Sequence, residues 1–377
     1  MDRTRPVRLG LGVWALVVAL IALVVLTFLP TPYVIQRPGP VYDTLGTAAG
    51  ADGEQVPLIQ VEGTETFETA GSLDLTTVQV VGNRERTPSW FELALAWMDS
   101  SRAVVPLDSV FPEGVTTEQR DERNATLMVD SQHEATAAAL NELGYDTGAE
   151  VVVQEVVEDA PAEGALEAED VITAVDGTAV ASVKQLRQAI QDAAGAPVEL
   201  TVQRGGEEQI VEVTPAKQTD GDVTTWLIGV TLRTDYDFEI DVTLQLDNVG
   251  GPSAGMMFAL GIIDTVTEGE LNGGKNVAGT GTIEADGTVG PIGGIRQKLY
   301  GARDAGAEYF LAPSTNCDEV TGHIPDGLTV ISTSSLEESL AALDVIAEGG
   351  DVGSLPSCDV VTLSLIHISE PTRPLYI

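Results

Sequence analysis

Residues 9–29 form an apolar run of 21 residues without a charged side chain. As a helix this run would be about 31 Å long, close to the roughly 30 Å hydrocarbon core of a bilayer. Three arginines precede it, so the positive-inside rule places residues 1–8 in the cytoplasm as a stub and the rest of the chain outside. The run is longer than the apolar region of a signal peptide, and no small-x-small cleavage site stands out before Pro30. The sequence therefore predicts a single-pass anchor in the cytoplasmic membrane.

The formal net charge of −39 over 377 residues narrows the range of partners. A surface of this sign repels phosphates, so nucleic-acid binding is not expected. With only three histidines and no Cys/His cluster at metal-ligand spacing, no metal and no cofactor are expected. Cys317 and Cys358 lie on the predicted outside, where a pair forms one disulfide. The alternative is two free buried thiols.

The last residues differ in character from the rest of the chain, which is rich in Val, Ala, Gly, Asp and Glu. The stretch 363–373 resembles the translation of a transposon-end adapter used to prepare sequencing libraries. Residues 363–377 are therefore interpreted as a sequencing-adapter artefact and, with His367, are not expected to belong to the fold.

The pattern of residues divides the predicted outer part into three α+β pieces. Residues 30–147 are expected to hold a Pro-rich extended linker and a small α+β region. This region contains a helix that begins after Thr87 with Pro88 as its first residue, and another that begins near Asp130 or Ser131. Residues 148–217 and 224–349 are expected to form two further domains.

Residues 148–217 alternate strand, turn, strand, helix, strand and strand, with a helix capped by Ser182. Together with the segments APAEGAL and DVITAVDG, this order resembles a PDZ domain of the bacterial protease-associated kind. The resemblance implies a groove between a strand edge and a helix, where a peptide adds as an extra strand. The expected carboxylate-binding loop is not evident, and its nearest candidate is residues 148–151.

Three segments of residues 224–349 carry residues suited to nucleophilic catalysis. In the first, Ser253 follows glycines and enters an apolar helix, where backbone N–H groups can stabilise an oxyanion. In the second, Thr280 stands among small residues that allow close backbone approach. The third, residues 290–298, begins another helix and delivers Lys298, one of only four lysines in the chain.

In this order and spacing, the three segments resemble the proteolytic domain of Lon-type serine proteases over about 125 residues. The resemblance implies Ser253 as nucleophile, Lys298 as general base and Thr280 as a hydrogen-bond partner of the lysine. It also implies an oxyanion-binding backbone loop around Gly251, Pro252 and Ala254. A lysine acts as a base only when its amine is neutral, so burial must lower its pKa by about 3 units, on the order of 4 kcal/mol.

No ATPase half accompanies these segments. Residues 269–276 approach a phosphate-binding loop but lack the Ser or Thr that would bind magnesium, and an apolar helix rather than a strand precedes them. We expect a polar connection at this point and an enzyme that does not depend on ATP.

Two other functions compete with this interpretation. The segment from Gly251 to Gly255 also fits the Gly-x-Ser-x-Gly elbow of α/β-hydrolases, for which Asp304 and His323 would complete a triad. A non-catalytic anchored adaptor, which binds partners through its PDZ-like groove, is the second.

As a whole, the chain resembles the PDZ-containing Lon-like endopeptidases of bacterial envelopes. The resemblance implies ATP-independent cleavage of unfolded or exposed polypeptides outside the cytoplasmic membrane, and it implies a homo-oligomer. The expected partners are thus polypeptide substrates, further copies of the chain and the membrane.

Overall fold

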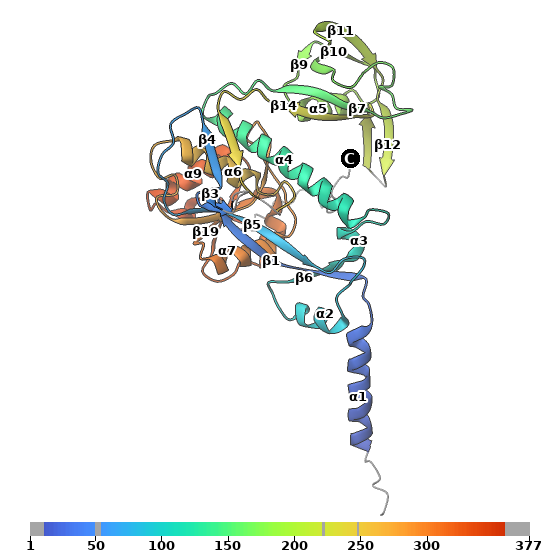
Figure 1. Ribbon diagram of the computed structural model, residues 1–377, viewed down its shortest axis with the longest axis vertical. Helices are drawn as coiled ribbons and strands as arrows, with labels where there is room; N and C mark the ends of the chain where they lie inside the picture. Colours follow the sequence, from blue (N-terminus) through green and yellow to red (C-terminus); the bar gives the residue numbers. More distant parts are fainter. Residues whose placement is uncertain (1–10, 50–53, 221–222, 247–248, 359–377) are drawn as a thin grey trace, which may run out of the picture.

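The protein is described by a computed structural model that covers residues 11–49, 54–220, 223–246 and 249–358 (Figure 1). The predicted stub at 1–8 and the predicted adapter segment at 363–377 lie outside these residues. The fold is of the expected mixed α+β kind, with two six-stranded sheets and four pairs of strands.

The helices are α1 (Leu11–Phe28), α2 (Trp90–Trp97), α3 (Leu107–Val110), α4 (Thr117–Glu142), α5 (Val183–Asp192), α6 (Gly255–Val266), α7 (Ile295–Ala305), α8 (Cys317–Val320) and α9 (Leu336–Ala347). The strands of the first half are β1 (Tyr33–Asp43), β2 (Thr47–Ala49), β3 (Gln55–Pro57), β4 (Ile59–Glu62), β5 (Ser72–Val81), β6 (Ala103–Pro106), β7 (Glu150–Val156), β8 (Val171–Val175) and β9 (Thr178–Ala179). The remaining strands are β10 (Val198–Arg204), β11 (Glu207–Val213), β12 (Ala216–Asp220), β13 (Val223–Leu227), β14 (Val230–Asp235), β15 (Asp241–Leu244), β16 (Asn276–Gly279), β17 (Thr282–Ile283), β18 (Val289–Gly290), β19 (Tyr309–Pro313) and β20 (Thr329–Thr333).

One large sheet joins the two ends of the described chain, in the strand order β20-β19-β16-β5-β1-β6. Strands β5, β16, β19 and β20 are parallel, and β1 lies antiparallel between β5 and β6. The sequence assigns residues 30–147 to a region of their own, but β1, β5 and β6 complete the sheet of the later domain. The apolar, β-branched sequence of β5 suits this central position, where Leu73 and Leu75 are fully buried.

Helix α6 lies at the centre of the main core. Its apolar residues occur on every side, so it has to be covered all round, and every residue from Gly255 to Asp264 is buried. Helices α4 and α9 and strands β4 and β5 contact it. This burial fixes the start of α6, which follows the loop that carries Ser253.

The second sheet belongs to the PDZ-like part, with the order β11-β10-β8-β7-β14 and β9 beside β8. Two expectations are corrected here. Strand β14 pairs with β7, so residues 230–235 belong to this sheet and not to a domain that starts at 224. Residues 148–151 form no ligand loop, because β7 begins at Glu150 and lies between β8 and β14.

Figure 1 shows the PDZ-like strands gathered at one end of the molecule and the large sheet and its helices beside the long helix α4. Helix α4 begins at Thr117, well before the predicted start near residue 130, with a capping box between Thr116 and Gln119. Helix α2 is capped by Ser89 and begins at Trp90, so the predicted first helical residue, Pro88, is two positions too early. Helix α5 is capped by Ser182, as predicted.

The predicted anchor does form a helix, α1, whose 18 residues are about 27 Å long. Figure 1 shows α1 pointing away from the rest of the molecule. Within the described ranges, however, none of the helices is long and apolar enough to cross a membrane. The predicted single-pass anchor at residues 9–29 is therefore not supported.

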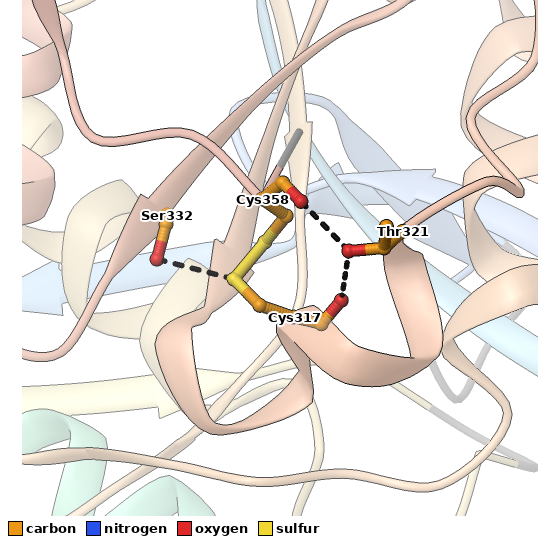
Figure 2. The surroundings of a disulfide bond; sticks show 4 residues. All are labelled: Cys317, Thr321, Ser332 and Cys358. Atoms are coloured by element: carbon orange, nitrogen blue, oxygen red, sulfur yellow. Dashed lines mark hydrogen bonds between the residues drawn. A yellow bond between two sulfur atoms is a disulfide. The ribbon is translucent and has the colours of Figure 1, made fainter. Parts of the chain in front are cut away.

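A disulfide joins Cys317, at the start of α8, to Cys358, near the end of the described chain (Figure 2). The Thr321 hydroxyl lies 2.9 Å from the Cys317 carbonyl oxygen and 2.8 Å from that of Cys358, and it can donate to either. Both cysteines pack with the cluster that includes Phe310 and Leu299. The bond thus ties the last described residues to the layer that carries α7.

Candidate active site

Three elements bring Ser253, Thr280 and Lys298 together. Ser253 precedes α6, Thr280 follows β16, and Lys298 lies on α7. The Lys298 Nζ atom is 2.8 Å from Ser253 Oγ and 2.7 Å from Thr280 Oγ1. The Thr280 hydroxyl in turn donates to the Ser253 carbonyl oxygen at 2.9 Å. The hydroxyl oxygen, the amine and the threonine therefore form one continuous hydrogen-bonded group.

Lys298 is buried, with 2% of its surface exposed. Burial disfavours the charged amine and lowers the pKa of Lys298 from 10.5 to about 7. Among the described residues no carboxylate forms an ion pair with this amine, although the chain has 58 acidic residues. A large fraction of the lysine is thus neutral near pH 7 and can accept a proton.

Helix α4 shapes the loop before the serine. The Gly251 N–H donates to the Asn124 carbonyl at 2.9 Å, and the Ser131 hydroxyl donates to the Pro252 carbonyl at 3.0 Å. Gly251 has φ +89°, which glycine adopts without strain. A Cβ atom at Gly250 would lie 2.8 Å from Asn124 Cβ, so α4 leaves no room for a side chain there.

These contacts correct part of the expected oxyanion loop. The N–H of Gly251 is already engaged by α4, and Pro252 has no N–H to offer. The N–H groups of Ser253 and Ala254 remain, at the N-terminus of the 12-residue helix α6, where the helix dipole favours negative charge.

A second turn positions the lysine. The side chain of Asn316 accepts from the Ile292 N–H and donates to the Ile292 carbonyl, both at 2.9 Å. Gly294 follows in the left-handed region, with φ +70°, and α7 begins at the next residue. Lys298 therefore contacts the serine from a helix whose start is held in place by the two hydrogen bonds of Asn316.

A cavity of about 470 Å³ opens beside the dyad. Ser253, Lys298 and Gly293 line it on one side, and residues 76–79 of β5 line it on another. Strand β16 pairs with β5 only over residues 72–75, so the next part of β5 meets the cavity rather than a strand on that side. An extended polypeptide could add to β5 at this place.

The alternative triad is not assembled. The His323 Nδ1 atom is 3.1 Å from the Thr321 carbonyl oxygen, and Asp304 pairs with Arg303. No hydrogen bond joins either residue to Ser253 anywhere in the described ranges. The same part of the chain contains no cluster of three or more His, Cys, Asp or Glu side chains that could hold a metal ion.

In the PDZ-like part, β14 is the terminal strand of its sheet and lies beside helix α5. The segment 226–230 leads into β14 at this edge. It is therefore a better candidate for the carboxylate-binding loop than residues 148–151. Gln191 of α5 bonds both backbone groups of Trp226, at 2.6 and 2.9 Å. The signal that could have found this loop is the segment Leu-Ile-Gly-Val at 227–230.

Two family models match the chain: a PDZ domain over residues 114–214 and the Lon protease (S16) C-terminal proteolytic domain over residues 234–345. Lon protease 2 of Herpetosiphon aurantiacus is 35% identical over 109 residues, or 27% of this chain and 13% of that protein. Lon protease 1 of Bacillus subtilis is 34% identical over 108 residues, or 28% of this chain and 14% of that protein.

Among solved structures, the PDZ domain of an SdrC-like protein from Listeria monocytogenes is 29% identical, with a TM-score of 0.21. It matches 23% of this chain and 88% of that one. The chain thus combines a PDZ domain with a Lon-type proteolytic domain, and the latter indicates a serine endopeptidase.

Proposed function

We propose that this protein, which carries a PDZ domain and a Lon-type proteolytic domain, is an ATP-independent endopeptidase with a Ser–Lys dyad. Ser253 is the nucleophile and Lys298 the general base. The observation that carries the proposal is the buried Lys298 amine, 2.8 Å from the serine hydroxyl oxygen and with a pKa lowered to about 7. A serine hydroxyl attacks a peptide only when a base takes its proton, and here the base is in place.

The reaction follows from this geometry. The neutral Lys298 amine takes the Ser253 proton while Oγ bonds to the peptide carbonyl carbon, and the carbonyl oxygen becomes an oxyanion beside the Ser253 and Ala254 N–H groups. When the C–N bond breaks, the Lys298 ammonium returns the proton to the leaving amine. Water, deprotonated by the same lysine, then hydrolyses the serine ester. Thr280 orients the amine throughout.

The proposed substrates are unfolded or exposed segments of polypeptide. The edge of β5 at residues 76–79 that faces away from β1 supports this, because it extends beyond the pairing with β16 and lines the cavity beside Ser253, where an extended chain can pair. The edge of β14 offers a second place where a chain end or strand can add. Capture there raises the concentration of substrate near the dyad. The proposal also includes assembly into a homo-oligomer, and the match to the Lon-type proteolytic domain supports it.

We also propose that the catalytic domain works outside the cytoplasm. The disulfide between Cys317 and Cys358 supports this location, because disulfides persist in oxidising compartments and are rare in the cytosol. Independence of ATP fits the same location. The near-match to a phosphate loop at 269–276 lies in the connection between α6 and β16.

The test is cleavage of an unfolded protein by the purified chain without ATP, with wild type compared with Ser253→Ala and Lys298→Met. Lys217→Met is the matched control, because Lys217 is exposed on β12 of the PDZ-like part. We expect both dyad variants to be inactive and the control to be fully active. Activity that survives in Lys298→Met but is lost in His323→Ala would return the hydrolase triad. If serine-directed probes do not label Ser253 in the wild-type protein, the non-catalytic adaptor would be favoured.

A further inference from the structure

The turn between β17 and β18, residues 284–288, is where the PDZ domain touches the catalytic domain through charged groups. Lys184, on the first turn of α5, places its Nζ atom 2.9 Å from Glu284 Oε2 and 3.3 Å from Asp286 Oδ2. It also donates to the Thr288 hydroxyl at 3.2 Å. In a chain with only four lysines, one of them thus holds three groups of a single turn in another domain.

Helix α4 of the catalytic domain also forms hydrogen bonds with this turn. The half-buried carboxylate of Glu134 accepts the Ala285 N–H at 2.7 Å, and the Asn141 side chain donates to the Ala285 carbonyl at 2.9 Å. Tyr236, the residue directly after β14, donates its hydroxyl to Glu134 at 2.8 Å. Helix α5 therefore contacts the turn directly, and Tyr236 contacts it indirectly through Glu134.

The turn is directly continuous with the active site. Strands β17 and β18 pair at its base, and Gly281 and Thr280 come immediately before β17. The Gly281 N–H donates to the Ser253 carbonyl at 3.0 Å, and Thr280 contacts both Ser253 and Lys298. Strand β17 thus links the turn directly to the two residues that bond Ser253 and Lys298.

We infer that Lys184 is a positioning residue for catalysis: by holding the 284–288 turn, it lets the PDZ domain set the geometry of Ser253 and Lys298. The inference rests on the proposed dyad. The ion pairs of Lys184 are exposed, and exposed ion pairs contribute little to global stability. Loss of these pairs should therefore leave folding nearly unchanged, so that a change in turnover reports on the geometry of the site.

The experiment measures kcat and KM on a short peptide substrate for wild type, Lys184→Met, Lys184→Arg and the control Lys217→Met. We expect Lys184→Met to lower kcat by about three- to tenfold, with KM and Tm nearly unchanged. Lys184→Arg should restore most of the loss because it keeps the charge. In a double-mutant cycle with Glu284→Gln, the second change should add little to the first. A kcat for Lys184→Met equal to that of wild type overturns the inference.

Amide hydrogen exchange at Gly281 gives a readout that does not need turnover. We expect faster exchange in Lys184→Met than in Lys217→Met, because the Gly281 N–H is bonded to the Ser253 carbonyl. Unchanged exchange would contradict the inference even if the protein cleaves nothing. Wild-type protein without activity or probe labelling would instead contradict the proposed function.

Discussion

The amine of Lys298 is bonded to two hydroxyls, those of Ser253 and Thr280. An acidic neighbour would stabilise the ammonium and raise the pKa of the lysine, so the absence of an ion pair within the described residues matters for a protein of charge −39. Burial alone lowers this pKa to about 7. A strongly acidic chain can thus contain a largely neutral lysine, because the amine is buried and forms no ion pair with a carboxylate of the described residues.

The first prediction is a pH dependence of kcat. Because the neutral amine is the active form, activity should be low at pH 5.5, rise through about pH 7 and level off above pH 8. The measurement is the hydrolysis rate of a saturating peptide across that range, together with the folded fraction at each pH. A flat profile would show that no group with a pKa near 7 acts as the base.

The same burial predicts a dependence of stability on pH. The folded lysine releases its proton near pH 7, while the unfolded lysine keeps it until about pH 10.4, so the unfolded chain binds more protons in between. The free energy of unfolding of wild type should therefore rise with pH relative to Lys298→Met, by up to about 1.4 kcal/mol per pH unit. Urea titrations at pH 7, 8 and 9 measure this; parallel curves would contradict it.

Thr280 is fully buried and accepts from the lysine while it donates to the Ser253 carbonyl. Thr280→Val keeps the shape but removes both bonds, which costs about 1–3 kcal/mol for the unpaired groups. We expect kcat to fall at least tenfold, whereas Thr280→Ser should keep most of the activity. Steady-state kinetics of the two variants decide, and equal activity in both would exclude the hydroxyl from the site.

At the residue scale, the order and spacing of three short segments that resemble the Lon-type domain predicted a group of Ser253, Thr280 and Lys298, and the structure brings these side chains together. Sequence could not predict Ser131, whose hydroxyl bonds Pro252 across 121 residues of chain. Sequence equally could not predict the contacts that Asn124, Glu134 and Asn316 make with distant segments. Their role comes from elements that meet only in the folded protein, and nothing in their neighbouring residues marks them.

At the scale of elements, helices could be predicted where the sequence has both a start signal and a stop signal. Helix α7, Ile295–Ala305, begins within the predicted segment 290–298, and it ends at Gly306 in the left-handed conformation. The first part of helix α4 was not predictable, because residues 117–127 are polar and mostly exposed and give no apolar stripe. Strand β14 was assigned to the wrong sheet because its partner β7 lies far away in sequence.

The disulfide gives a prediction at this scale. It closes a loop of 41 residues, so its removal should lower the free energy of unfolding by about 4 kcal/mol. The comparison is between wild type and the double variant Cys317→Ser, Cys358→Ser, by thermal and urea unfolding. Reduced wild type should behave like the double variant, and equal stability of oxidised and reduced protein would contradict the prediction.

At the scale of the whole molecule, the PDZ domain is inserted into the catalytic domain. The chain leaves α4 through Thr147 and returns through Asp237, whose N–H donates to the Thr147 carbonyl at 3.0 Å. Strands before and after the insertion share one sheet. Sequence could predict the order of the modules but not this sharing, because pairing over such distances leaves no local pattern.

Adjacent entry and exit points predict that the insertion can be removed. Replacement of residues 149–235 by a linker of about four residues, the length of a hairpin loop, should leave a catalytic domain that folds cooperatively. Its Ser253 should still react with a serine-directed probe, while its kcat on a peptide should resemble that of Lys184→Met. Failure to unfold cooperatively by calorimetry would show that the PDZ domain is part of the catalytic fold.

The pairing of β5 with β16 also determines when the large sheet can form during synthesis. Ser72 and Asn276 are partners across 204 residues, which a ribosome adds at about 5–20 residues per second. Strand β5 therefore waits about 10–40 seconds for its neighbour, while the PDZ domain is completed in the interval. Ser253, Thr280 and Lys298 follow the PDZ domain along the chain, and strands β19 and β20 of the large sheet follow Lys298. A nascent chain that has not yet reached Lys298 lacks the base of the proposed dyad, so the proposed activity can begin only after the PDZ domain and α7 have been made.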